Sequence, residues 1–216
     1  MPHDGTRRGT GTGPYDRTDG GSGSVREFFG ARAAGWDTRF PDDGPAYSAA
    51  VTELHLHEGD AVLDAGCGTG RALPALRAAA GARGTVLGAD LTPQMLTAAA
   101  DAARRSDARL MLADAARLPL TDGCLDAVFA AGLISHLPDA ARGLREFARV
   151  VRPHGTLALF HPVGRAALAA HKGRTLRADD IRAESNLRTL LDASGWRLTS
   201  FTDAEDRYLA LAARTG

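Results

Sequence analysis

The residues best suited to ligand binding form a glycine-rich segment that opens with an acid, Asp64-Ala65-Gly66-Cys67-Gly68-Thr69-Gly70. Because glycine has no side chain, a loop of this composition lets the backbone approach a ligand closely. A dinucleotide-binding loop needs a third glycine at position 71, which Arg71 occupies here. This spacing disfavours a nicotinamide dinucleotide as the ligand, and with it a nicotinamide-dependent oxidoreductase.

Two further aspartates stand where a nucleoside could be recognised. Asp90 follows the glycine loop by about 20 residues, a spacing at which a carboxylate can accept hydrogen bonds from both ribose hydroxyls. Thr92 fits the helix-capping position that would otherwise explain this acid. Asp114 ends a later apolar run, where it could accept from an adenine amine while the N–H of Ala115 faces a ring nitrogen. Its alternative is a turn aspartate.

The elements that position these residues follow from alternating apolar runs and helical segments. Buried strands are predicted at 61–64, 85–90, 109–113, 125–131 and 156–160, and helices at 71–80, 93–105, from Asp139 onward and at 187–193. Such alternation implies right-handed crossovers and a parallel sheet with helices on both faces. The run 196–211 breaks the alternation and predicts an antiparallel pair at the sheet edge. We therefore expect a Rossmann-like, doubly wound α/β fold of seven strands, mostly parallel, with an antiparallel C-terminal hairpin.

The N-terminal part differs in composition from the rest. Residues 1–24 are rich in Gly, Thr, Asp and Arg and almost lack apolar side chains, so we expect a disordered tail followed by one domain over 25–216. Helices are predicted at 25–35 and 46–56. The aromatic residues between them and in the second helix, Trp36, Phe40 and Tyr47, either form a lid that excludes water or anchor these helices in the core.

The overall composition limits the possible partners. Lys and Arg number 26, as do Asp and Glu, so the formal net charge is +0 and the chain lacks the broad charge footprint of a nucleic-acid or membrane-surface binder. No apolar run approaches the roughly 20 residues of a membrane span. The cysteines, Cys67 and Cys124, are expected at opposite edges of the sheet, which argues against a disulfide and for a cytoplasmic setting. They form no metal-binding cluster, so we expect no metal.

Five motifs in order resemble those of the class I S-adenosylmethionine-dependent methyltransferases, and the likeness extends from Val25 to Arg214. The matching segments are 62–70, 88–96, 113–120, 126–137 and 149–155. One departure is His154, which stands in a turn where the family commonly has glycine. The resemblance is to methyltransferase type 11-like members.

The resemblance implies that S-adenosylmethionine is the cofactor and assigns residues to its parts. Asp64 and the glycine loop would hold the methionine portion, Asp90 and Leu91 would flank the ribose and adenine, and the backbone near Ala131 would receive the amino group. The cofactor-binding residues implied are Asp64, Gly66, Cys67, Gly68, Gly70, Asp90, Leu91, Met95, Asp114, Ala115 and Ala131.

The acceptor is expected to be a small molecule that offers an oxygen, nitrogen or carbon nucleophile, because the domain carries no insertion to grip a macromolecule. His136 follows the fourth strand and is a candidate general base, although a loop-shaping role is favoured. Trp36, Tyr47 and His161 are candidate substrate residues. The basic segment 164–182 either borders the acceptor site or is a solvated surface. The alternative function is a non-catalytic, regulatory binder of S-adenosylmethionine, and no oligomeric state is predicted.

Overall fold

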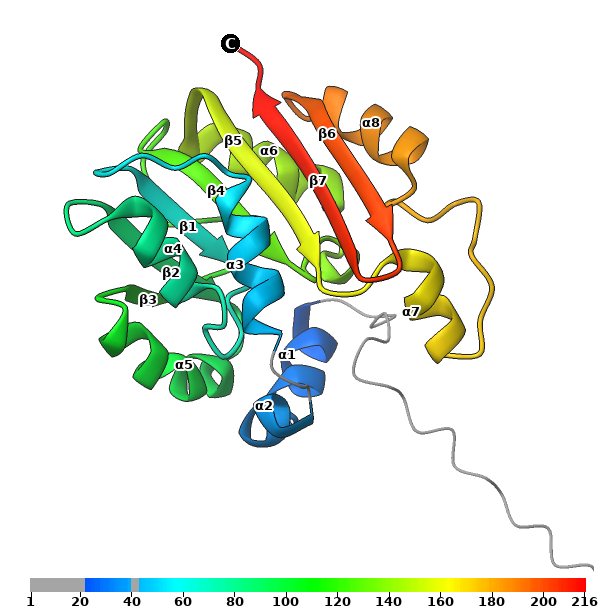
Figure 1. The fold of residues 1–216 in the computed structure, drawn as a ribbon, viewed down its shortest axis with the longest axis horizontal. Coiled ribbons are helices and arrows are strands. Elements are labelled where there is room, and N and C mark those ends of the chain that lie inside the picture. The colour runs from blue at the N-terminus through cyan, green and yellow to red at the C-terminus, as the bar shows by residue number, and fades with distance from the viewer. Residues whose placement is uncertain (1–21, 40–42) are drawn as a thin grey trace, which may run out of the picture.

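Seven strands form one sheet in the order β3-β2-β1-β4-β5-β7-β6, as Figure 1 shows. The structure is a computed structural model that describes residues 22–39 and 43–216; most of the expected tail and Phe40 lie outside this range. The strands are β1 (Ala61–Ala65), β2 (Thr85–Asp90), β3 (Arg109–Leu112), β4 (Leu125–Ala131), β5 (Val151–His161), β6 (Trp196–Ala204) and β7 (Arg207–Arg214). β1 to β5 pair in parallel, and β7 is antiparallel to both of its neighbours. The predicted fold class is therefore confirmed.

Helices cover both faces of the sheet, and each face has its own apolar cluster. One face carries α3 (Gly44–Thr52), α4 (Leu73–Ala80) and α5 (Pro93–Arg105), while the other carries α6 (Ala140–Val150) and α8 (Glu184–Asp192). On the second face Leu144, Phe147 and Trp196 are fully buried. The Trp196 indole donates to the carbonyl of Leu144 at 2.9 Å, which satisfies the polar atom of this large core side chain.

The remaining short helices lie at the carboxyl edge of the parallel strands (Figure 1). The predicted helix at 25–35 is divided into α1 (Ser22–Gly30) and a 3₁₀ turn, η1 (Ala33–Gly35), and is followed by α2 (Trp36–Arg39). A second 3₁₀ turn, η2 (Ile134–His136), follows β4, and α7 (Arg165–His171) follows β5. The boundary expected between tail and domain falls in the first turn of α1.

Two local expectations have different outcomes. Asp139 caps α6 as predicted, because its Oδ1 accepts from the N–H of Arg142 at 2.9 Å. Thr92 stands at the N-cap of α5 without a side-chain capping bond. Instead, its N–H donates to Asp90 Oδ1 at 2.8 Å. The position of Thr92 at the N-cap is therefore as predicted, but Asp90 has a structural role as well, because it accepts from the N–H of Thr92.

β5 begins at Val151 rather than at Thr156, since Val151 pairs with Leu125 before a register shift in β4. Within this added stretch His154 has a φ of 66°, a left-handed conformation that glycine adopts without strain. This explains in physical terms why glycine is common at the position.

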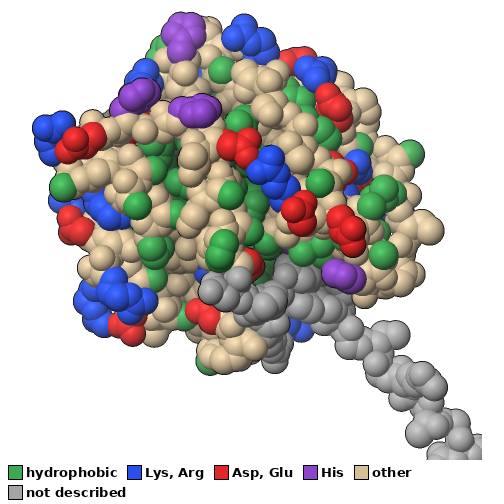
Figure 2. Space-filling model, in the orientation of Figure 1, with side chains coloured by type: hydrophobic (Ala, Val, Ile, Leu, Met, Phe, Trp, Pro, Cys, Tyr) green, Lys and Arg blue, Asp and Glu red, His purple; other side chains and the backbone are tan. Residues whose placement is uncertain are grey.

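Charge is distributed evenly over the face seen in Figure 2, where acidic and basic side chains are interspersed. Within residues 22–39 and 43–216, no helix has the length and apolar character that crossing a membrane requires. Cys67 is buried, Cys124 is exposed, and both are free thiols, in agreement with the expectation that they form no disulfide.

Candidate functional site

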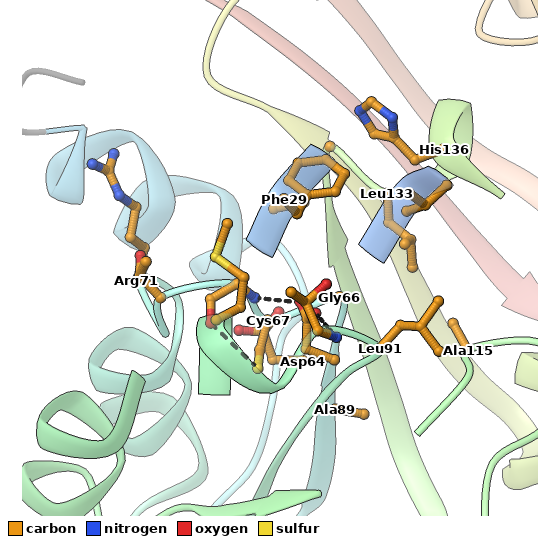
Figure 3. A pocket seen from close by; sticks show the side chains of 18 of the residues that line it. Phe29, Asp64, Gly66, Cys67, Arg71, Ala89, Leu91, Ala115, Leu133 and His136 are labelled. Atoms are coloured by element: carbon orange, nitrogen blue, oxygen red, sulfur yellow. Dashed lines mark hydrogen bonds between the residues drawn. The ribbon is translucent and has the colours of Figure 1, made fainter. Parts of the chain in front are cut away.

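A cavity opens at the carboxyl ends of β1, β2 and β4, beneath α1 (Figure 3). This is the edge at which open α/β sheets bind ligands. Ten of the predicted cofactor residues line it, which brings together parts of the chain that are far apart in sequence: Asp64, Gly66, Cys67, Gly68, Asp90, Leu91, Met95, Asp114, Ala115 and Ala131. Gly70 does not.

The glycine loop turns sharply between β1 and α4. Gly66, Gly68 and Gly70 have φ values of 67°, 53° and 84°, which other residues adopt only with strain. A Cβ on Gly68 would meet nothing within 4 Å, so the loop backbone faces open space there. A Cβ on Gly70 would instead lie 3.0 Å from Leu73 and 3.2 Å from Ala102, so Gly70 permits close packing of α4 and α5. Its predicted place in the cavity wall is not supported.

Asp90 fixes the loop as well as lining the cavity. Its Oδ2 accepts from the N–H of Gly68 at 2.9 Å, while Oδ1 accepts from the N–H of Thr92. Burial raises the pKa of Asp90, and the hydrogen bonds from Thr92 and Gly68 act against that rise. The Thr92 side chain and the Leu91 N–H also hydrogen-bond to this carboxylate, so a ligand hydroxyl would share the carboxylate with these donors or replace one of them.

Asp64 is a buried acid in the cavity wall, and its exposed fraction is only 2%. Burial raises the pKa of Asp64 to about 8, with the charge of Asp90 as the second cause. A cation placed beside Asp64 would favour its ionised form. The site is therefore suited to a positively charged ligand.

Asp114 and Ala115 lie at the cavity wall after β3. Asp114 Oδ1 accepts from the N–H of Ala116 at 2.9 Å, the turn arrangement that its alternative interpretation predicted. Because a carboxylate has two oxygens, this turn is compatible with a second, ligand-binding role.

Arg71 connects the glycine loop to the N-terminal helices, a role that its position in the sequence did not indicate. Its Nε donates to Asp37 Oδ1 at 3.1 Å, and its Nη1 pairs with Asp43. Asp37 also accepts from the hydroxyl of Thr69 at 2.7 Å. We call the group Asp37, Asp43, Thr69 and Arg71 the N-terminal clamp.

Aromatic side chains close the cavity on the side opposite Asp64, where Figure 3 shows Phe29 and His136. The Phe29 ring lies edge-on to His136 at 5.1 Å and also contacts Trp36 at 5.6 Å. Tyr47 lines the cavity and packs against Phe160 at 5.1 Å, so it serves both as wall and as core anchor. Phe29 and Leu133 are wall residues that the sequence did not single out as such, because an apolar side chain carries no chemical signal.

His161 is the predicted substrate residue that the structure keeps out of the cavity wall. It is 6% exposed, and its Nδ1 lies 3.0 Å from the N–H of Val163. Burial lowers the pKa of His161 to about 4, which keeps the ring neutral. Its neighbour Pro162 reaches the wall instead. The placement of His161 at the acceptor site is therefore corrected to a buried position beside it.

The fold and the site together define a nucleoside-binding α/β domain: a glycine loop after β1 and acids at the ends of β2 and β3 surround one cavity. In the part of the chain that the structure describes, no group of three or more His, Cys, Asp or Glu side chains is arranged to hold a metal.

Comparison with known proteins specifies the class. Residues 63–159 match the methyltransferase domain family. A demethylmenaquinone methyltransferase of Mycolicibacterium vanbaalenii is 31% identical over 187 residues, covering 75% of this chain and 79% of the relative. The methyltransferase GfsG of Streptomyces halstedii is 33% identical over 165 residues, covering 71% and 59%. A crystal structure of a SAM-dependent methyltransferase from Aquifex aeolicus superimposes with a TM-score of 0.71 at 20% identity, covering 85% and 98%.

The chain belongs to the class I S-adenosylmethionine-dependent methyltransferase family. The chain spans only part of some curated relatives: it covers 59% of the length of GfsG, and 40% and 34% of the lengths of two others. The family's methyl donor fits the residues present, because the open side of Gly68 leaves room for a ligand and the buried Asp64 suits a cation.

Proposed function

We propose that this chain transfers a methyl group from S-adenosylmethionine to an oxygen, nitrogen or carbon atom of a small molecule. The observation that carries the proposal is the convergence of Asp64, Asp90 and Asp114, from the ends of three successive strands, on one cavity. The Mycolicibacterium relative is named for demethylmenaquinone, a small molecule, which supports an acceptor of that class.

The donor supplies a methyl group already activated on a sulfonium, so the protein contributes mainly alignment. In this proposal Asp64 and the loop around Gly68 hold the methionine portion, Asp90 and Leu91 flank the ribose, and Asp114 with Ala115 binds the adenine. The backbone near Ala131 receives the amino group.

In this proposal the aromatic side chains opposite these acids limit the access of water. Phe29 and Trp36 cover the cavity, and Tyr47 completes its wall. Burial of the reacting centre strengthens the electrostatic contacts around it, because water no longer screens them. We therefore propose, as expected from the sequence, that Trp36 and Tyr47 lie beside the bound acceptor.

Turnover tests this proposal directly. The full chain is incubated with S-adenosylmethionine and a panel of phenols, amines and quinols, and S-adenosylhomocysteine is measured by mass spectrometry. We expect at least one acceptor to raise its formation well above the acceptor-free rate. Tight cofactor binding with no consumption across the panel would contradict the proposal and favour a regulatory binder.

His136 is proposed to shape the acceptor side of the cavity rather than to remove a proton. It lies in η2, its ring against Phe29. With an active acceptor, we expect His136→Gln to lower kcat less than about tenfold and to leave the pH profile unchanged. A loss of about 10²-fold or more, together with loss of the acidic limb on which the rate rises as the base loses its proton, would instead identify a general base.

A further inference from the structure

A second cavity, which we call the basic groove, lies beside the first and shares His136 with it. Ser135 and His136 of η2 form one end, and Arg165 and Leu168 of α7 with the loop 172–182 form the rest. Figure 1 shows α7 at the same edge of the sheet as α1, so both cavities open at the carboxyl edge. The two cavities therefore adjoin at His136.

The inner wall of the groove is a largely buried ion-pair network. Arg165 Nε pairs with Asp203 at 2.9 Å, and Arg182 Nη2 pairs with Asp180 at 3.0 Å. These four side chains are between 13% and 20% exposed. The Asn186 side chain donates to the backbone carbonyl of Asp180 at 3.0 Å, which anchors the loop 172–182 to α8. The wall is thus organised before any ligand arrives, which lowers the entropy cost of binding.

The charge of the lining is unequal. Five cationic side chains stand against three carboxylates in the groove, counting Asp203 of its inner wall, although the whole chain is neutral. The cations are Arg165, Lys172, Arg174, Arg177 and Arg182, and the carboxylates are Asp179, which pairs with Arg177 at 2.7 Å, Asp180 and Asp203. Arginine binds oxyanions through two parallel N–H donors, so a concave surface with this excess favours a carboxylate or a phosphate.

The groove also has an apolar side. Leu168 and Ile181 line it, and Leu176 is 48% exposed there. In the described part of the chain, one other large apolar side chain, Leu112, is exposed to such an extent. A ligand with an apolar body would remove Leu176 from water, a favourable change in free energy.

We propose that the basic groove binds the methyl acceptor, and that the acceptor is an amphiphile with an apolar body and an oxyanion, a carboxylate or a phosphate. The oxyanion lies among the cations of the loop 172–182, the body lies against Leu176, and the methylated end reaches past His136. This inference rests on the proposed function, because it takes the occupant of the groove to be the acceptor.

Three probes with one shared body test the inference. They are 4-phenylbutyrate, 4-phenylbutyl phosphate and the neutral 4-phenylbutyramide, titrated calorimetrically into the full chain saturated with S-adenosylhomocysteine. We expect at least one anion to bind about tenfold or more tighter than the amide at about 50 mM salt, and this advantage to shrink at about 500 mM. The tighter anion identifies the group as carboxylate or phosphate.

Substitutions locate the binding. In the double variant Lys172→Met/Arg174→Gln we expect the preference for the anion to fall below about threefold, with the affinity for the amide unchanged. Leu176→Ser is expected to weaken all three probes alike. Arg83→Gln, an exposed arginine in the turn before β2, is the control and keeps the preference. Thermal unfolding of each variant verifies that it is folded.

Equal affinity for the anions and the amide would overturn the inference. So would a preference that survives in the double variant, or one that Arg83→Gln removes equally. These binding measurements need no turnover, so they separate the two proposals. If the groove binds the anion as expected while no acceptor is methylated, the groove stands as an anion-binding site, and both its assignment to the methyl acceptor and the proposed function fail.

Discussion

At the scale of single residues, Asp90 combines two tasks. One carboxylate oxygen holds the N–H of Gly68 and the other the N–H of Thr92, so the acid ties the glycine loop to the start of α5. A ribose placed at the same carboxylate would share an anchor with the loop itself. Removal of Asp90 therefore affects both the ligand contact and the shape of the cavity.

We expect Asp90→Ala to weaken S-adenosylhomocysteine binding by about 100-fold, because at least two hydrogen bonds to a charged acceptor are lost. The fold should persist, since Asp90 lies at the cavity and not among the core side chains. Titration calorimetry measures the affinity and circular dichroism the fold. Asp101→Ala, at an exposed acid of α5, is the matched control. An unchanged affinity in Asp90→Ala would refute the ribose assignment.

Asp64 predicts a pH dependence of stability for the cofactor-free chain. Its pKa is about 8 in the folded chain and about 3.9 in an unfolded one. The folded state therefore holds one more proton between these values, and stability falls as the pH rises from about 4 to about 8. We expect the Tm of the wild type to fall by several degrees over this range.

Asp64→Asn removes this titration. The variant is expected to show a flatter dependence of Tm on pH than the wild type, and the difference should be largest on the alkaline side. Differential scanning calorimetry from about pH 5 to about pH 9 measures it. Parallel curves for the two proteins would mean that Asp64 titrates normally.

The acids of the site were predictable from the sequence, whereas its apolar walls were not. Asp64 and Asp90 each combine a chemically informative residue type with a strand end, and strand ends are visible in the apolar pattern. Phe29 gains its role only when α1 packs over the cavity. His161 also stands at a strand end, the end of β5, but its side chain points into the protein interior and is buried.

At the scale of elements, the N-terminal clamp joins α2 and the start of α3 to the glycine loop. Arg71 is 18% exposed and its partner Asp43 is 16% exposed, so these charges are better shielded from solvent than surface pairs, which contribute little. The residue that excluded a dinucleotide loop thus has a structural role: it holds the cover of the cavity in place.

We expect Arg71→Ala to speed the release of S-adenosylhomocysteine by about tenfold, because two ion pairs with the N-terminal helices are lost. Stopped-flow fluorescence of Trp36, which lies in the cavity wall, measures the release. Arg188→Ala, which removes an exposed pair on α8, serves as control. If release is equally fast in wild type and Arg71→Ala, the clamp does not restrain the cover.

Local signals explain which element boundaries were predicted. The cap at Asp139 acts within one helical turn, so the start of α6 can be predicted from the local sequence. The early start of β5 depends on pairing of Val151 with Leu125, a contact that no local pattern contains. The break after α1 is likewise decided by packing, since α1 and η1 both contact α5.

At the scale of the whole molecule, the packed core and the ligand cavities occupy different parts of the sheet. Both apolar clusters lie along its faces, and both cavities open at the carboxyl edge of its parallel strands. The parallel sheet and its C-terminal hairpin were predictable because alternation and handedness leave few arrangements. The basic groove was less so, because its inner wall joins Arg165 to Asp203, a residue of β6.

The antiparallel direction of β7 has a practical consequence. β7 starts near the carboxyl edge and runs away from it, so Arg214 lies at the opposite edge from both cavities, as Figure 1 shows. The described chain begins with α1, whose Val25 and Phe29 are cavity wall. A surface tether or fluorescent label joined after Arg214 would therefore leave both openings facing solution, whereas one joined just ahead of α1 would stand beside them.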